Sequence, residues 1–165
     1  MNKRIAIFLS LALLAPALAA TAQQHGHDPA QHQAPAGAKT PPADTRQAVR
    51  YPPELREHTL ANMRDHLLAL QQMQEALARG DYDAAAKTAE ERLGMTSLIA
   101  HGAQEVAKYM PKGMQDAGTA MHRSASRFAL SLQEASITGE LRKPLAELAT
   151  VTASCVACHA GYRLE

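Results

Sequence analysis

The chain has 165 residues, 46% of them hydrophobic, no Trp, two Phe, four Tyr and a formal net charge of +1 at pH 7. A chain of this length builds one small domain. A charge so close to zero argues against broad electrostatic binding of nucleic acid or of an anionic membrane. Few aromatic residues beside abundant Ala, Leu, Met and Gln favour helix over strand.

Residues 1–22 have the pattern of a secretory signal peptide. Lys3 and Arg4 precede an apolar run that ends in small residues with two Ala-x-Ala cleavage sites. The run is shorter than the roughly 20 residues that a membrane span needs, so an uncleaved anchor is the less favoured alternative. We therefore expect export to a bacterial periplasm and a mature chain without a membrane span. That chain keeps 15 basic and 16 acidic residues, a net charge of −1.

Residues 23–50 are rich in His, Pro, Ala and Gln and show no apolar periodicity, which predicts a disordered leader. His25, His27 and His32 raise a further question about this leader. If cleavage follows Ala22, the new terminal amine, two amides and one imidazole form a donor set that Cu(II) accepts in a square plane. The alternative, which we favour, is a soluble tether whose histidines are incidental.

The folded domain is expected over residues 51–165. A first helix over residues 53–79 begins at two prolines and ends before Gly80. A second covers residues 81–109, with Asp81 as a suitable N-cap and two internal glycines that allow a break into two helices. The apolar stripe of the first helix consists of Leu60, Met63, Leu67, Leu70, Met73 or Gln74, and Leu77.

Two more amphipathic helices are predicted, over residues 112–137 and over residues 144–162, where Pro144 suits the first helical position. No segment shows a strand pattern of useful length. Four such helices with short links predict an all-α fold, an antiparallel four-helix bundle. The alternative is a pair of helical hairpins that dimerise. The stripe of the last helix consists of Leu145, Leu148, Thr152, Cys155, His159 and Tyr162.

The only two cysteines of the chain, Cys155 and Cys158, lie in the C-terminal stretch VTASCVACHAGYRLE, directly before His159. On a helix the three side chains fall within an arc of about 100°. Two thiols one turn apart can add to the two vinyl groups of a haem, and the imidazole can reach the iron from the same side. The pattern C-x-x-C-H is the attachment signature of c-type haem.

Three other interpretations of the cysteines fit less well. A thioredoxin-like redox pair sits at a helix N-terminus after a strand, whereas this pair sits near the end of a predicted helix. A structural zinc site needs four ligands, and the chain has no second cysteine pair. A structural disulfide usually bridges distant segments rather than neighbouring turns of one helix. The sequence therefore favours one covalent haem c.

Residues 53–165, with CVACH in the last helix followed by AGYR, resemble the class II c-type cytochromes, which include cytochrome c′ and its low-spin relatives. The resemblance implies a left-turning four-helix bundle that holds one haem between its helices. It implies that His159 is the proximal iron ligand and that Arg163 is the family's basic residue four positions further on. It also implies a homodimer as one oligomeric state, because relatives often pair through their first two helices.

The resemblance also places the distal side of the haem on the first helix. Low-spin relatives bind iron there through a methionine, and cytochrome c′ carries a bulky apolar residue that leaves the iron open to small gases. Met63 precedes Gly80 by 17 residues, close to the family's distal position, and is our expected distal ligand. In the family an Arg often stands four residues before the distal residue, and the residue four after Arg56 is Leu60 rather than Met63. Arg56 and Arg64 are both candidates for haem propionate contacts, because a guanidinium group pairs well with a carboxylate. The rival ligands are His66, His101, Met121 and His122.

From these features we expect a periplasmic mono-haem cytochrome that carries electrons between redox partner proteins. A five-coordinate haem protein that binds nitric oxide or carbon monoxide is the alternative, and a periplasmic metal-handling protein is a second one. The sequence shows no acid–base pair or nucleophile constellation, so we do not expect an enzyme.

Overall fold

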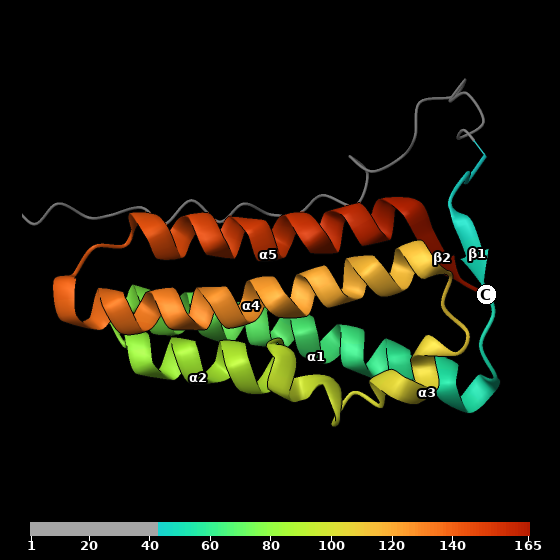
Figure 1. The fold of residues 1–165 in the computed structure, drawn as a ribbon, viewed down its shortest axis with the longest axis horizontal. Coiled ribbons are helices and arrows are strands. Elements are labelled where there is room, and N and C mark those ends of the chain that lie inside the picture. Colours follow the sequence, from blue (N-terminus) through green and yellow to red (C-terminus); the bar gives the residue numbers. More distant parts are fainter. Residues whose placement is uncertain (1–42) are drawn as a thin grey trace, which may run out of the picture. The chain divides into compact units, whose positions relative to one another are not determined.

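The computed structural model describes residues 43–165, which form one compact unit. The predicted signal peptide and most of the predicted leader, including His25, His27 and His32, lie outside the described residues. The described part is mostly helical, as predicted, with about five helices packed together (Figure 1). In chain order the elements are β1 Gln47–Val49, α1 Pro53–Ala78, α2 Tyr82–Arg92, the short 3₁₀ helix η2 Met95–Leu98, α3 Ala103–Ala107, α4 Lys112–Thr138, α5 Arg142–Gly161 and β2 Tyr162–Leu164.

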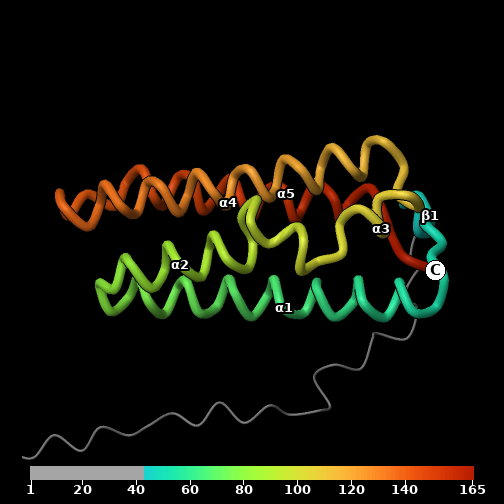
Figure 2. The backbone as a smooth tube through the Cα atoms, turned by 60° about the horizontal axis from the view of Figure 1, so that its bottom comes forward, coloured from blue at the N-terminus to red at the C-terminus, as the bar shows by residue number. Residues whose placement is uncertain are grey.

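Three helix pairs pack closely, namely α1 with α2, α2 with α4, and α4 with α5. Figure 2 shows the result as two layers, α1 with α2 and α4 with α5. Among the described elements, α1 and α5 do not form such a closely packed pair. Large side chains that are fully buried fill the space between the layers: Met73, Leu93, Phe128, Leu132 and Val151.

Helix boundaries agree with the sequence prediction to within two residues for α1, α4 and the start of α5. The second predicted helix is broken, which the sequence left open. The backbone of Gly102 has a φ of +61°, in the left-handed region that favours glycine, and this residue begins a new helical direction into α3. Among the described helices, none has the length and the apolar character that crossing a membrane requires.

The two strands were not predicted and they correct the sequence analysis. β1 and β2 pair in parallel, with Gln47 opposite Tyr162 and Val49 opposite Leu164. Residues 47–49 fall within the segment predicted as a disordered leader, so order begins a few residues earlier than expected. Strands of three residues are too short to show a periodicity, and their partners lie far apart in the sequence. The pairing holds the start of α1 and the end of α5 at one end of the molecule (Figure 1).

The start of α2 offers a direct test of the local structure. Asp81 is the N-cap, as predicted, and its carboxylate accepts a hydrogen bond from the backbone N–H of Ala84 at 3.1 Å. We expect Asp81→Ala to lower the free energy of unfolding by about 1 kcal/mol, because the helix loses this cap. Urea unfolding followed by circular dichroism measures the change. Glu91→Ala, at an exposed position of the same helix, is the control and should change stability by less than about 0.5 kcal/mol.

Candidate functional site

The C-x-x-C-H motif lies in the last two turns of α5. Both cysteines are free thiols and half-buried, and His159 is exposed. Cys155 packs against the main core. Cys158 packs against a second cluster at the end of the molecule that carries the strands, where the buried residues are Val49, Tyr51, Val106 and Met114. The motif therefore occupies the boundary between two apolar clusters, with its histidine facing outward.

The electrostatic setting of the two thiols bears on their chemistry. Burial raises the pKa of Cys155 above its ordinary value. Burial, and then the charge of Cys155, raise the pKa of Cys158 in the same direction. Thiols of a redox pair have lowered pKa values, because the thiolate is the nucleophile. The environment of this pair therefore argues against a thioredoxin-like role.

The surface of α5 has two distinct sides. On one, Glu147 pairs with Arg127 of α4 at 3.3 Å and marks the side that faces α4. In helical projection Leu145 and Val156 lie about 160–180° from Glu147. Their side chains are 53% and 63% exposed, although they are large and apolar. His159 is exposed and lies about 40–60° from these two residues in projection, at the edge of the apolar strip.

A matching flank occurs on α1. Arg92 of α2 pairs with Asp65, its Nε 3.0 Å from Oδ2, and marks the side of α1 that faces α2. Met63 and Leu67 lie about 160° from Asp65 in projection. They are 37% and 70% exposed, so this part of the predicted stripe is not buried. The prediction holds for Met73, which is in the core, and for Leu70 and Leu77, which pack against it.

The buried face of α1 differs in part from the predicted stripe. The core cluster includes several alanines of α1 and α2, the two helices that pack on each other, whereas Met63 and Leu67 are left on the flank of α1. Histidine and threonine, which the hydropathy pattern does not pick out, share the buried face with alanines. The buried residues of α1 are Thr59, His66, Ala69, Met73 and Ala76.

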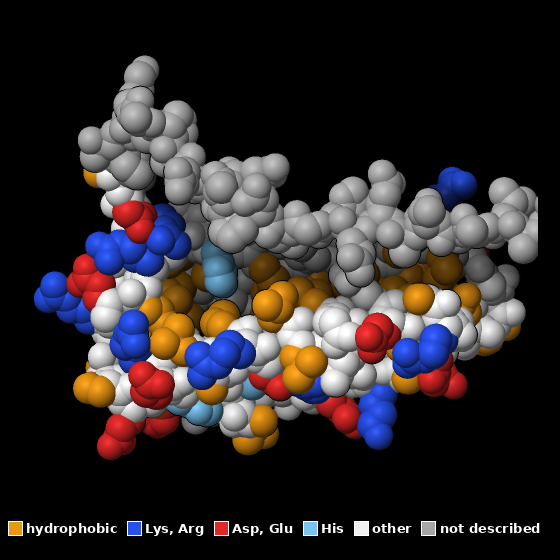
Figure 3. Space-filling model, turned by 180° about the vertical axis from the view of Figure 1, so that it is seen from behind, with side chains coloured by type: hydrophobic (Ala, Val, Ile, Leu, Met, Phe, Trp, Pro, Cys, Tyr) orange, Lys and Arg blue, Asp and Glu red, His pale blue; other side chains and the backbone are white. Residues whose placement is uncertain are grey.

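α1 and α5 each carry exposed apolar side chains and do not form a closely packed pair. Because α1 packs on α2, α2 on α4 and α4 on α5, the remaining side of the arrangement lies between α1 and α5. Figure 3 shows hydrophobic side chains gathered along a hollowed part of one face, with a histidine among them. Exposed apolar surface on both bordering helices is typical of a site that binds an apolar ligand or a partner.

Several buried polar side-chain atoms have no hydrogen-bond partner, and two of them lie at the end of the molecule that carries the strands. Among the described residues, four buried side-chain atoms lack a hydrogen-bond partner: Tyr51 Oη, Thr59 Oγ1, His66 Nε2 and Arg163 Nε. Burial, followed by the charge of Cys158, raises the pKa of Tyr51 to about 12, so its hydroxyl stays a donor. A buried unsatisfied group costs about 1–3 kcal/mol. Tyr51 and Arg163, which flank the end of α5, are thus donors that acidic groups of a ligand would satisfy.

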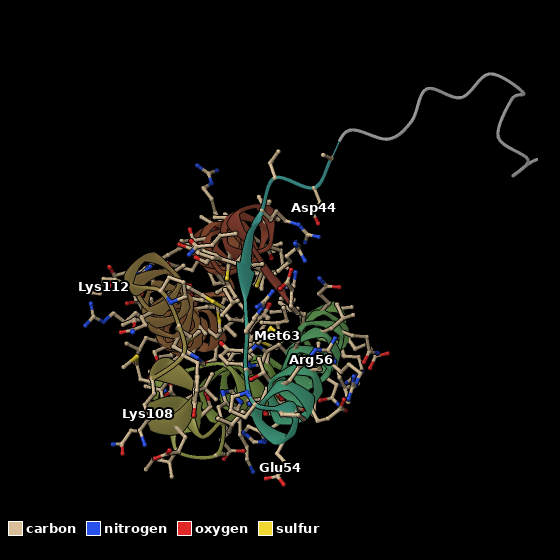
Figure 4. The ribbon with its side chains drawn as sticks, turned by 90° about the vertical axis from the view of Figure 1, so that its right-hand side faces the viewer. Asp44, Glu54, Arg56, Met63, Lys108 and Lys112 are labelled. Carbon is tan, nitrogen blue, oxygen red and sulfur yellow. The ribbon has the colours of Figure 1, made fainter. Side chains whose placement is uncertain are left out.

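A cavity of about 320 Å³ adjoins this region, between α1, η2, α3 and α4. Met63 lies on its wall, and Figure 4 shows this residue inside the ring of helices. Three of the four rival ligands, His66, His101 and His122, line the same cavity, whereas Met121 is buried in the main core.

The structure does not bring this cavity to the motif itself. Cys155, Cys158 and His159 are not among the residues that line it. The connection is indirect, through Val106 and Met110, which line the cavity and also belong to the cluster around Cys158. Met63 as a distal ligand therefore stays a prediction.

The two arginines expected near the propionates have no such contact. Arg56 pairs with the neighbouring Glu57 at 3.8 Å, and Figure 4 shows it near the start of α1. Arg64 is exposed and makes no ion pair within residues 43–165. Arg163 is better placed, since it follows α5 directly, with its Nη2 2.9 Å from Glu165. Its Nε lies 3.7 Å from Asp44 Oδ2 and has no hydrogen-bond partner among the described residues.

Sequence reasoning considered the cavity histidines one at a time and missed that they meet. We expected a surface or hydrogen-bonded position for each of them. His101 and His122 are hydrogen-bonded, whereas His66 is only 8% exposed and its Nε2 has no hydrogen-bond partner among the described residues. His66 and His122 come from helices far apart in the sequence, so no local spacing relates them. The one signal available was the interval of seven between Thr59, His66 and Met73, which places all three on one face of α1.

Comparisons with protein-family models, with curated proteins and with solved structures find no match for this chain.

Proposed function

We propose that this protein is an exported mono-haem c-type cytochrome, built as an antiparallel four-helix bundle, that carries electrons between redox partner proteins. The observation that carries the proposal is the C-x-x-C-H motif at the end of α5, beside an apolar side of the molecule that α1 and α5 leave open. Fully packed helices would leave no room for a haem there. The exposed flanks of both helices supply the apolar surface that such a group covers.

The residues present fit a covalent haem. Cys155 and Cys158 would hold it through two thioethers, and His159 would supply the proximal nitrogen. Tyr51 and Arg163 offer unsatisfied donors for its acidic groups. When bound, the haem supplies iron that takes up and releases one electron at a time.

The roles of the chain follow from this fit. The two cysteines prevent loss of the haem, and the strand pair keeps the end of α5 beside the start of α1. The apolar flanks exclude water from one side of the site, while the position of Cys158 near the surface leaves an edge open to a partner. Electron transfer of this kind needs contact at that edge and no substrate pocket.

One observation favours gas binding as a second candidate. The cavity beside Met63 has room for a small molecule, and most of its polar groups are histidines and amides. If Met63 does not bind iron, a diatomic gas has space to reach the distal side. The same fold then serves uptake of nitric oxide or carbon monoxide, and Met63 decides between the two functions.

The proposal is tested on protein isolated from the periplasm of a host that matures c-type cytochromes. We expect one haem per chain that stays with the polypeptide in acid acetone, and an absorption spectrum that changes reversibly on reduction. Covalent attachment through two thioethers gives both results. Extraction of all haem by acid acetone, or a chain that carries none, would overturn the assignment.

A further inference from the structure

A cluster of three histidines at the wall of the cavity has no role in the proposed cytochrome. His66 of α1, His101 between η2 and α3, and His122 of α4 have ring centroids separated by 4.7, 5.5 and 6.0 Å. Imidazoles on a shared tetrahedral ion, with metal–nitrogen bonds of about 2.05 Å, have centroids about 5.2 Å apart. The three separations lie on both sides of this value, so small side-chain movements would bring the rings to the spacing of ligands on one ion.

Hydrogen bonds fix which nitrogen of two of these rings is free. His122 Nδ1 lies 2.7 Å from the carbonyl oxygen of Leu93, which only accepts, so Nδ1 carries the proton. The hydroxyl of Ser97 donates to the carbonyl of Gly94 at 2.7 Å and is left to accept from His101 Nδ1 at 3.3 Å. In both rings Nε2 therefore keeps its lone pair. Metal-binding histidines are held in this way by a carbonyl or hydroxyl at the other nitrogen.

His66 contributes the third nitrogen. Its Nε2 is buried and has no hydrogen-bond partner, an arrangement that a protein rarely keeps without a reason. Burial, and then the charges of His101 and His122, lower the pKa of His66 to about 4. Burial likewise lowers the pKa values of His101 and His122. All three rings are therefore neutral at pH 7, which is the state that binds metal.

We propose that His66, His101 and His122 form a binding site for one first-row transition-metal ion, separate from the haem. Among the described residues, no carboxylate lines the cavity, which disfavours hard cations such as Ca²⁺ and Mg²⁺. Imidazole suits zinc and copper, and the thioether of Met110 on the same wall favours Cu(I). Cu(I) is thus the ion we expect, with Zn(II) as the competing choice.

Binding requires a small rearrangement. As the side chains stand, the described residues contain no group of three or more His, Cys, Asp or Glu arranged around an ion. Rotation of a ring about its side-chain bonds moves Nε2 by a few ångströms, and the adjoining cavity gives space for that movement. The unpartnered His66 loses no hydrogen bond through Nε2 when it turns, so it is the ring expected to move.

The test uses the full-length holoprotein dialysed against limiting Cu(I) under reducing, oxygen-free conditions, or against Zn(II), with bound metal counted by mass spectrometry. We expect one equivalent beyond the haem iron, and X-ray absorption at the metal edge showing imidazole ligands. His66→Gln, His101→Gln and His122→Gln should each weaken binding at least tenfold, because each removes a ligand.

Two controls make the result decisive. A variant with His25, His27 and His32 changed to Gln removes the leader histidines and should keep the site. Circular dichroism and thermal unfolding show whether each cluster variant is folded. The added ion should raise the melting temperature of the wild type and of the leader variant, and not that of the cluster variants. No stoichiometric binding of either ion, or binding lost only in the leader variant, would overturn the proposal. So would a His66→Gln variant that changes the haem spectrum and keeps the second metal, since His66 would then belong to the iron.

Discussion

Replacing both Cys155 and Cys158 with alanine is expected to abolish covalent haem attachment and to leave the isolated protein poorly folded. The thioethers are the only covalent links to the haem that we propose, so none of it should survive acid acetone. Without the haem, the exposed flanks of α1 and α5 keep their apolar surface in contact with water, and the ligand's contribution to stability is lost. Haem content per chain and the thermal unfolding curve measure the two effects.

Single variants and a neighbouring residue supply the controls. Cys155→Ala and Cys158→Ala should each retain haem through one thioether or lose it. Ser154→Ala, one residue before the motif, removes only a hydroxyl that donates to the carbonyl of Thr150 at 3.0 Å and should keep full haem content. A double variant with wild-type haem content and stability would contradict both the attachment and the cytochrome function.

Much of the helical framework could be predicted because its signals are local. Two prolines and Gly80 bound α1, and Asp81 caps α2 through a hydrogen bond that lies within one turn. The strand pair could not be predicted, since Gln47 and Tyr162 meet only after the whole chain has folded. A three-residue strand carries too few side chains for an alternation to be recognised.

The face of α1 was predicted less well than its length. Hydropathy selects the large side chains, and Met63 and Leu67 were therefore assigned to the core. The buried face of α1 includes the small residues Ala69 and Ala76, which hydropathy does not single out, beside the large Met73. A haem bound on the flank would cover Met63 and Leu67. These two residues would then be buried, as predicted, but against a ligand rather than against a helix.

The candidate site likewise has a part that local sequence spacing predicts and a part that only the folded structure brings together. The spacing of Cys155, Cys158 and His159 is readable directly, because all three lie within two turns of one helix. The histidine cluster is not readable, because its members come from three elements and only the fold brings them within 6.0 Å of each other. Their neutral state is likewise a property of burial, which no residue type alone reveals.

The distal ligand separates electron transfer from gas binding, and Met63→Ala tests it. If Met63 binds iron, the reduced wild type is low-spin and takes up carbon monoxide slowly. The variant should then become high-spin, bind carbon monoxide readily and have a lower reduction potential, because the thioether's preference for ferrous iron is lost. Truncating a fully buried Met to Ala lowers the free energy of unfolding by about 2–5 kcal/mol. Since Met63 is 37% exposed, we expect a smaller loss. Absorption spectra, carbon monoxide binding and a redox titration measure these changes.

Met95→Ala is the matched control, because Met95 is 38% exposed and does not line the cavity beside Met63. It should leave the spin state and the potential unchanged. A wild type that is already high-spin and binds carbon monoxide freely would contradict ligation by Met63, make Leu60 the expected distal neighbour and favour gas binding. A low-spin spectrum that survives Met63→Ala would instead point to a histidine. His66 is then the first to test, because its buried Nε2 has no hydrogen-bond partner and lines the same cavity as Met63.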